Sequence, residues 1–442
     1  MKLDYIRTFL LGFGFFGISI VWSVYNAFVP VFLREYDLPW SLVGFVMTLD
    51  NILAITLLPY IGQLSDRTRS RLGRRMPYIL LGTPIAALFL VTIPMLHLNL
   101  PRVASTFAFM TFAIVMMNIA MAIFRTPTVA LMPDITPSPL RSKANGIINL
   151  MGGVGTSIAF LIGGALFAYA QSAPFILAAV VLLMAEAVVL LTIREPKVDV
   201  AAVATDGGKV QRPSLGQSLR STLADVAGIV RQRDKSALFV CLAIFCWFMG
   251  YNAIETFWTS YGKEVLYAGE IAAGTLTADA AVARAASLLT YLSAAFLVFA
   301  LPAGFIATRF GRKPTILLGL GVLFALWAGM RFTTNNIYVM VTLVVSGIAW
   351  ALININSLPI VADLAPAGKI GAYTGIYYFF SMLAASTSPT IVGWLMDLAG
   401  VRVMFVFTPV FMLLAFLCML AVRRSEPVAA PTAWEAVADA DF

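Results

Sequence analysis

Four charged side chains interrupt otherwise apolar stretches of the chain, and they are the residues best placed to do chemistry. They are Asp50, Arg125, Glu186 and Glu255. A charge at membrane depth costs roughly 2.5–3.5 kcal/mol on insertion scales, so each should face protein or a water-filled cavity. A carboxyl group there can take up and release a proton, and an arginine can hold hydroxyl oxygens with its planar fork of donors. Structural ion pairing is the alternative for each residue.

Asp50 and Glu255 are the two carboxyl groups predicted to bind and release a proton or another cation. Asp50 lies near the middle of its apolar stretch and is followed by Asn51. Its alternative role is that of a fixed partner for Arg125. Glu255 lies one helical turn after Tyr251, where it can accept sugar hydroxyl hydrogens or carry the proton. Glu186 has no aromatic or amide neighbour at helical spacing and is predicted to be structural.

Aromatic and amide side chains recur at helical spacing and form polar stripes on apolar segments. Sugars present flat C–H faces and rims of hydroxyl groups, so a sugar site needs aromatic platforms beside amide, carboxyl or guanidinium partners. The alternative is that the Trp and Tyr residues mark the membrane interface. The predicted substrate-binding residues are Trp22, Tyr25, Asn26, Asn118, Arg125, Trp247, Tyr251, Asn252, Glu255, Trp350, Asn354 and Tyr377.

The elements that must position these residues are long apolar helices. Hydrophobic residues make up 60% of the chain and charged residues only 12%, which excludes an ordinary soluble protein. Stretches of roughly 20 apolar residues predict membrane helices, because backbone groups in lipid must bond within their own segment. The twelve predicted spans are Phe9–Leu33, Leu42–Gly62, Tyr78–Met95, Val103–Ile123, Ala144–Ala168, Ala173–Ile193, Ala237–Trp258, Ala285–Ala307, Thr315–Met330, Ile337–Ile353, Gly371–Leu395 and Val403–Val422.

The net charge of +8 indicates how the chain is oriented in the membrane and does not indicate a nucleic-acid-binding surface. With the N-terminus taken as cytoplasmic, most Lys and Arg fall in the tails and the even-numbered connections, which share one side of the membrane. We therefore expect a multi-pass protein of a bacterial-type inner membrane with both termini in the cytoplasm. No cleavable signal peptide is evident. Cys241, Cys246 and Cys418 lie in apolar spans and predict no disulfide framework.

The two halves of the chain repeat. Trp22–Ala27 is similar to Trp247–Ala253, the basic hairpin after the second span returns after the eighth, and Pro133–Pro137 matches Ala362–Pro366. We expect an all-α fold of two six-helix bundles, with a substrate site between them near the membrane midplane. The predicted divisions are residues 1–193, a cytoplasmic linker of 194–235, residues 236–424 and a tail of 425–442.

These features resemble a major facilitator superfamily transporter over essentially the whole chain. The run Gly62–Arg67, followed by Ser70–Arg75 and Pro77–Ile79, is similar to the glycoside–pentoside–hexuronide:cation symporters, and most of all to the sucrose–proton symporters, some of which carry maltose. Phe124–Pro127 is similar to the fourth helix of that group, where an arginine contacts sugar. The plant members carry a coupling aspartate on this helix, whereas the matching position here is apolar, near Ile114.

The basic hairpins are predicted to form the gate at the cytoplasmic side. Their charges can pair with acidic residues at the helix ends in one conformation and separate in the other. The alternative is that the basic residues only set topology, which does not explain Asp66. The predicted gating residues are Gly62, Asp66, Arg67, Arg74, Arg75, Asp134, Arg309, Arg312 and Asp363. His97 is expected to be a solvated surface residue.

The expected function is proton-coupled uptake of a disaccharide such as sucrose or maltose, by a monomer with no cofactor, no bound metal and no nucleic-acid partner. Sodium remains open as the coupling ion, although a proton is favoured. The nearest alternative is a proton antiporter that exports drugs or other amphipathic compounds. A polytopic enzyme or a sugar-sensing receptor is the alternative from another class. We see neither paired catalytic groups nor an output domain in the sequence.

Overall fold

The structure is a computed structural model that describes residues 3–137, 140–195, 226–231, 233–366 and 369–423. Throughout these residues the regular structure is helical. The first six long helices are α1 (Tyr5–Arg34), α2 (Trp40–Arg67), α3 (Met76–Asn99), α4 (Ala104–Ile135), α5 (Arg141–Tyr169) and α6 (Ala173–Thr192). The second six are α9 (Ser236–Tyr261), α11 (Ala278–Phe310), α12 (Arg312–Gly329), α13 (Asn336–Asp363), α14 (Ile370–Ala399) and α15 (Met404–Ala421). The predicted linker and tail lie largely outside the described residues.

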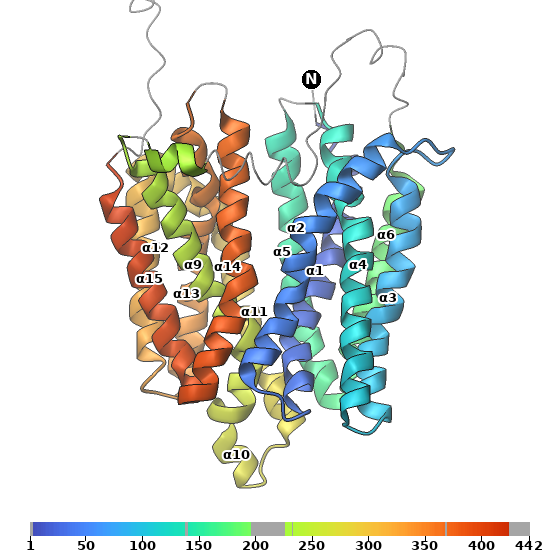
Figure 1. Cartoon of the computed structure of the whole chain (residues 1–442), viewed down its shortest axis with the longest axis vertical. Coiled ribbons are helices and arrows are strands. Elements are labelled where there is room, and N and C mark those ends of the chain that lie inside the picture. Colours follow the sequence, from blue (N-terminus) through green and yellow to red (C-terminus); the bar gives the residue numbers. More distant parts are fainter. Residues whose placement is uncertain (1–2, 138–139, 196–225, 232, 367–368, 424–442) are drawn as a thin grey trace, which may run out of the picture.

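The long helices form two bundles that stand side by side (Figure 1). In the described residues, 11 helices are long and apolar enough to cross a membrane. The remaining long helix, α12, packs on α13 and α15 just as α3 packs on α4 and α6. It therefore takes the place in the second bundle that α3 has in the first. The predicted all-α fold of two six-helix bundles is confirmed.

Two helices run well beyond their predicted spans. The apolar stretches end at Ile123 and Ile353, whereas α4 continues to Ile135 and α13 to Asp363. Both extensions contain prolines, which membrane helices tolerate because neighbouring groups satisfy the freed backbone atoms. Arg125 therefore lies inside a continuous helix, and Asp134 and Asp363 lie in the last turns of α4 and α13.

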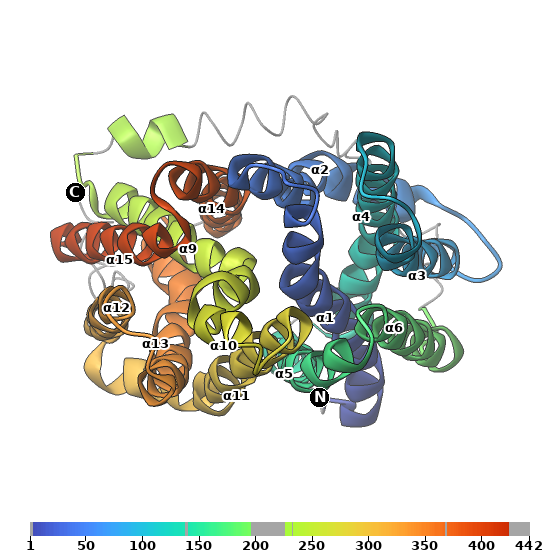
Figure 2. The same ribbon diagram turned by 90° about the horizontal axis from the view of Figure 1, so that it is seen from below.

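The bundles meet along three helix pairs, namely α2 with α14, α5 with α11, and α1 with α9; Figure 2 shows these pairs from the end at which α10 (Ala268–Ala272) lies. Glycines allow the close approach. A Cβ atom added to Gly393 would lie 2.3 Å from the Trp40 carbonyl oxygen, and one added to Gly164 would lie 2.7 Å from the Ala283 carbonyl oxygen. Gly164 and Gly393 are separated in the sequence by the same number of residues as Pro133 and Ala362, so they occupy repeat-related positions in the two bundles.

The end of α3 is packed against the end of α1, and this overturns the expectation for His97. The side chain of His97 is buried and its ring stacks on Phe32, with 4.4 Å between the ring centres. Its Nε2 atom lies 3.2 Å from Glu35 Oε2. The prediction of a solvated surface histidine was wrong because tertiary packing covers this helix end.

Candidate functional site

A cavity of about 1370 Å³ lies between the two bundles. It reaches Tyr5 and Leu301 at the end of the molecule where α1 begins, which we call the N-terminal end. At the opposite end, the α10 end, contacts between the bundles close it. Six of the predicted substrate-binding residues line the cavity, namely Trp22, Arg125, Tyr251, Glu255, Trp350 and Asn354.

The wall from the second bundle carries an aromatic platform. The rings of Tyr251 on α9 and Trp350 on α13 are stacked, with 4.1 Å between centres and 8° between planes. Phe248 meets the Trp350 ring edge-on at 5.6 Å. Because the three rings hold one another in place, they offer a flat apolar surface of the kind that a sugar ring covers.

The facing wall from the first bundle carries the positive charge. The Arg125 guanidinium lies 5.9 Å from the centre of the Trp22 ring, a cation–π distance. Asp50 does not form an ion pair within 4.0 Å of Arg125 in the described part of the chain; its Oδ1 accepts a 2.8 Å hydrogen bond from Asn51. The alternative in which Asp50 is a directly bonded partner of Arg125 is therefore not seen in this conformation.

Other predicted residues lie behind the cavity walls. Tyr25 is fully buried, meets the Trp22 ring edge-on at 5.7 Å, and lies beside the buried Asn118. Trp247 is part of the core of the second bundle, and Asn252 donates to the Phe248 carbonyl of its own helix.

The remaining predicted residue of the second bundle is Tyr377, which bonds to Ser357 at 3.2 Å between hydroxyl oxygens. Glu186 is buried between α6, α4 and α1; a Cβ atom added to Gly14 would lie 3.2 Å from its Oε1. Neither residue lines the cavity between the bundles.

A polar contact between the two bundles involves Glu255 of the cavity lining. Asn26 on α1 donates from Nδ2 to Oε1 of Glu255 on α9 at 3.4 Å. The repeated motifs Trp22–Ala27 and Trp247–Ala253 therefore lie on neighbouring helices of opposite bundles.

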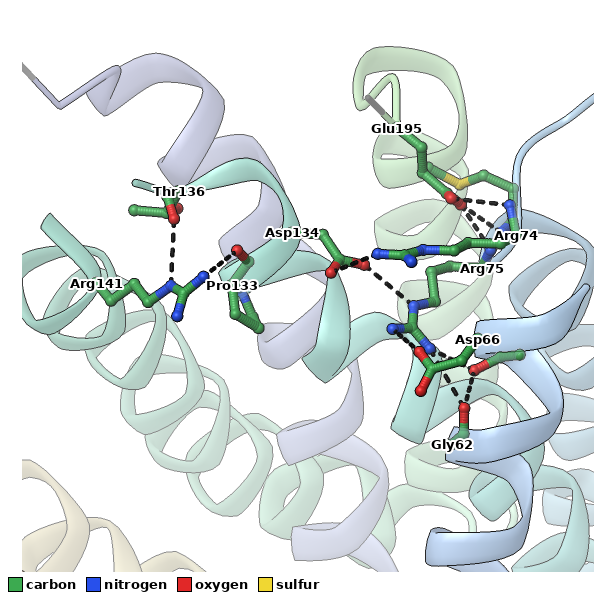
Figure 3. Close-up of polar contacts among 11 residues, drawn as sticks. Gly62, Asp66, Arg74, Arg75, Pro133, Asp134, Thr136, Arg141 and Glu195 are labelled. Carbon is green, nitrogen blue, oxygen red and sulfur yellow. Dashed lines mark hydrogen bonds and ion pairs between the residues drawn. The ribbon is translucent and has the colours of Figure 1, made fainter. Parts of the chain in front are cut away.

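The basic hairpin of residues 66–75 is bound to its own bundle (Figure 3). Arg75 is buried and lies 2.5 Å from Asp66 and 3.1 Å from Asp134, and its NH1 donates to Ser65. Arg74 lies 2.7 Å from Asp134. The Gly62 carbonyl accepts from Ser65 at 2.9 Å. The side chain of Arg67 lies outside the described residues.

The second hairpin shows the same arrangement in the other bundle. Arg312 forms an ion pair with Asp363 and donates to the Pro359 carbonyl. Arg309 lies over the ring of Phe310. Both sets of contacts stay within one bundle, so the N-terminal end is not bridged by them while the cavity is open there.

Glu195, which the sequence analysis missed, fixes the first hairpin. Its carboxylate accepts the backbone N–H groups of Arg74, Arg75 and Met76 at 2.8, 2.7 and 3.0 Å. Gly73 makes room for it with a φ of 114°, a conformation that favours glycine. An acidic residue two positions after the sixth predicted span was the only sequence signal for this role. A carboxylate at the start of α3 also complements the helix dipole.

Replacing Glu195 with alanine should destabilise the protein by about 1–3 kcal/mol, because three backbone donors lose their acceptor. The melting temperature of the purified protein would measure this. Glu195→Gln should lose less, since it keeps one acceptor oxygen, and Glu270→Ala, at an exposed residue, should change little. Equal melting temperatures for Glu195→Ala and the native chain would contradict the assignment.

The α10 end is closed by charged groups that the sequence analysis also missed. Glu35, just after α1, lies 2.7 Å from Arg102 and 2.8 Å from Lys263 of the other bundle. Burial opposes ionisation of Glu35, but bonds from His97 and Lys263 and the nearby positive charges outweigh it and lower the pKa of its carboxyl to about 2. Asp397 on α14 accepts from the backbone N–H groups of Trp40 and Ser41, at the start of α2.

The stabilisation from Glu35 should depend on pH in a defined window. Because the pKa in the folded state lies below the ordinary value of 4.5, the contribution is complete above that value and is lost as the pH falls toward 2. The melting temperature of Glu35→Gln should therefore be lower than that of the native chain at pH 6. The gap should stay nearly constant down to a pH of about 4.5 and shrink as the pH falls further. A gap that is constant from pH 6 to pH 3 would contradict the lowered pKa.

Solved structures share this fold at low sequence identity. A mutant of the nucleoside transporter NupG superposes with a TM-score of 0.72, covering 95% of this chain and all of that chain at 13% identity. A bacterial homologue of the lysosomal transporter Spinster, described as inward-facing and unoccupied, gives a TM-score of 0.69 at 15% identity. It covers 97% of this chain and all of that chain.

Curated relatives match only in part. An uncharacterized symporter of Synechocystis is 33% identical over 142 residues, which is 30% of this chain and 26% of that protein. The general alpha-glucoside permease of Schizosaccharomyces pombe is 28% identical over 160 residues, 33% of this chain and 28% of the permease. Proton-associated sugar transporter A of mouse is 28% identical over 156 residues, 34% of this chain and 21% of that protein. Each alignment covers less than a third of the relative.

The profile of the Major Facilitator Superfamily matches the chain over residues 11–293 and 271–438. Together these ranges include both bundles and the cavity between them. The chain therefore belongs to the major facilitator superfamily and is a membrane transporter, not an enzyme.

Proposed function

We propose that this transporter takes up a disaccharide such as sucrose or maltose together with a proton. The observation that carries the proposal is the pairing of the Tyr251–Trp350 platform with Arg125 and Trp22 on the facing wall. A sugar ring stacks on the platform through its C–H face while its hydroxyl oxygens accept from the guanidinium. Glu255 and Asn354 line the same cavity and complete the set of polar partners.

The coupling proton is carried by Asp50 or Glu255. In the proposed orientation both termini are cytoplasmic, so the cavity opens to the cytoplasm and the α10 end faces outward. Alternating access then requires the α10 end to separate and the hairpins at the N-terminal end to approach one another. Proton and sugar can shift the equilibrium between the conformation open at the N-terminal end and the one open at the α10 end only if they bind one conformation more tightly than the other.

The names of two relatives support this assignment. One is an alpha-glucoside permease and another a proton-associated sugar transporter. The sucrose–maltose group within the superfamily, the coupling ion and the monomeric state are part of the proposal.

Proteoliposome uptake tests the proposal. Vesicles that contain the purified protein would receive labelled sucrose, maltose or glucose under an inward proton gradient, and in parallel under a sodium gradient. We expect uphill accumulation of a disaccharide with the proton gradient and its collapse with a protonophore. If only the sodium gradient drives accumulation, sodium and not the proton is the coupling ion. If neither gradient drives uphill transport, the protein does not carry out coupled uptake.

A second candidate function is proton-coupled export of amphipathic compounds. The observation that favours it is the apolar character of much of the lining, which includes Phe15, Phe160, Leu289, Phe296 and Leu297. In the same vesicles, export would appear as proton-driven movement of a lipophilic dye in the direction opposite to the proton. Dye movement without sugar movement would select this function.

A further inference from the structure

A row of contacts leads from the cavity to the α10 end, between α1 with the residue after it and α9 with the π-helical turn that follows it, Gly262–Leu266. The contact nearest the cavity is the hydrogen bond from Asn26 to Glu255. In the next contact, the Thr259 hydroxyl donates to the Ala27 carbonyl at 2.5 Å. The contacts farthest from the cavity are two ion pairs, Lys263 with Glu35 at 2.8 Å and Arg34 with Glu264 at 3.5 Å. Glu255 and Thr259 are spaced four residues apart and share one face of α9, and Lys263 follows in the π-helical turn. We call this set of contacts the α1–α9 seam.

Glu255 belongs to the cavity and to the seam at the same time. It lines the cavity, yet its Oε1 accepts from an amide of the other bundle. Asn26 can reach this oxygen only while the bundles are in contact at the α10 end, because the two residues lie on different bundles. Opening the α10 end must therefore remove the amide donor from the carboxyl group.

This geometry links protonation to the conformation. An N–H group binds an ionised carboxylate more strongly than a neutral carboxylic acid. A contact that strengthens when the proton leaves, and that exists only when the seam is closed, must by thermodynamic reciprocity help to expel the proton when the seam closes. The same reciprocity makes protonation of Glu255 favour opening of the seam.

We propose that Asn26 and Glu255 are the coupling contact of this transporter: closure of the α1–α9 seam places the Asn26 amide on Glu255 and drives its proton into the cavity, which is then open at the N-terminal end. The proposal rests on the proposed proton coupling and names Glu255, in place of Asp50, as the group whose proton is tied to closure. Asn26 acts as a positioning residue for it.

Other groups near this contact must be separated from it. The charge of Glu255 acts on Asp50 of α2 and on Tyr251 of its own helix, while Arg125 of α4 and Trp350 of α13 line the same cavity. Farther along the seam, the lowered pKa of Glu35 keeps that carboxyl ionised between pH 5 and 8, so the charge of Glu35 in its ion pair with Lys263 does not change in this range. His97 lies beside Glu35 and is the one histidine of the chain, so it has its own control variant.

A cysteine reporter in the seam tests the proposal without any sugar. Val31 lies four residues after Ala27 and four before Glu35, on the seam face of α1, and it is buried. Val31→Cys would be introduced after Cys241, Cys246 and Cys418 are replaced by alanine. The rate at which N-ethylmaleimide labels the purified protein would then be measured from pH 8 to pH 5 and divided, at each pH, by its rate with a free cysteine peptide, because the thiolate is the nucleophile and its fraction falls on acidification. We call this ratio the labelling rate, and we expect it to rise about tenfold on acidification, which corresponds to about 1.4 kcal/mol of linkage.

Five variants of the reporter protein distinguish the possible outcomes. Glu255→Gln should label fast at every pH, since a neutral amide replaces the carboxylate, whereas Glu255→Asp should keep a pH dependence. Asn26→Ala should label fast with little pH dependence. Asn252→Ala is the matched control, because Asn252 donates within its own helix, and should behave like the native reporter. His97→Gln should also keep the pH dependence.

Several results would overturn the inference: a reporter rate that does not change with pH, a pH dependence that survives in Glu255→Gln, or Asn26→Ala labelling like the native reporter. Loss of the pH dependence in His97→Gln would transfer the role to His97. Proton-driven sugar uptake with a pH-independent seam would reject this contact and leave the proposed function standing. A pH-dependent seam without sugar uptake would keep the contact and reject the sugar.

Discussion

Arg125→Lys should reduce disaccharide uptake about 100-fold while leaving the protein folded. Lysine keeps the positive charge but loses the planar fork, and the loss of two charge-assisted hydrogen bonds of about 1.5 kcal/mol each corresponds to that factor. The guanidinium is held at the cavity wall beside Trp22, where no second arginine lines the cavity in the described residues. The initial rate of labelled sugar entry, measured over a range of sugar concentrations, would give the change in KM and in maximal rate.

The matched control for this experiment is Arg331→Lys. Arg331 lies outside the cavity near the α10 end, so the same chemical change there should leave uptake nearly unaffected. The melting temperatures of both variants should stay close to that of the native chain. Native-like accumulation by Arg125→Lys would remove the arginine from the site and with it the main support for a polyhydroxylated substrate.

Gly393→Ala should abolish most transport by preventing closure of the α10 end. The added Cβ atom would lie 2.3 Å from the Trp40 carbonyl oxygen and 2.6 Å from its carbon, both backbone atoms that cannot rotate away. Overpacking of this kind costs about 1–3 kcal/mol, enough to shift the balance between open and closed forms by roughly 5- to 150-fold. The expected result is low uptake together with fast labelling of a seam cysteine at Val31.

The control for Gly393→Ala is Gly375→Ala on the same helix. A Cβ atom added to Gly375 would meet nothing within 4 Å, so the variant has the same change in helix propensity without the collision. Gly164→Ala, at the repeat-related position on α5, should act like Gly393→Ala because its added Cβ would lie 2.7 Å from the Ala283 carbonyl oxygen. If Gly393→Ala transported normally while its seam stayed closed to label, the close approach of α2 and α14 would have no role in closure.

The prediction of helices and bundles from sequence depended on a strong and local signal. Apolar runs of membrane length must be helical because lipid offers no partners for backbone groups. The ends of α4 and α13 were missed, since polar residues and prolines such as Pro133 and Pro359 stop an apolar run without stopping the helix. The sequence repeat indicated where the two bundles divide, although the residues of the linker lie mostly outside the described ranges.

Part of the candidate site was accessible from sequence for a similar reason. Charged and aromatic residues such as Arg125, Glu255 and Trp350 stand out in apolar helices because burying them is costly without a cavity, and the structure places them around one. The same criterion also selected Trp247, which instead packs in the core of the second bundle. Helical spacing alone cannot tell which face of a helix meets the partner bundle, since both faces of a membrane helix are apolar.

The sequence by itself therefore determined that this protein is an all-helical membrane carrier with a few ionisable groups in its interior. Only the tertiary structure decided which side chains meet across the bundles, namely Asn26 with Glu255 and Glu35 with Lys263. It also showed that Glu195 holds the hairpin and that His97 is buried. The physical reason is that the backbone N–H and C=O groups of a membrane segment must hydrogen-bond within that segment, so the local sequence is enough to predict the helix. A contact between side chains 228 or 229 residues apart depends on the packing of whole bundles.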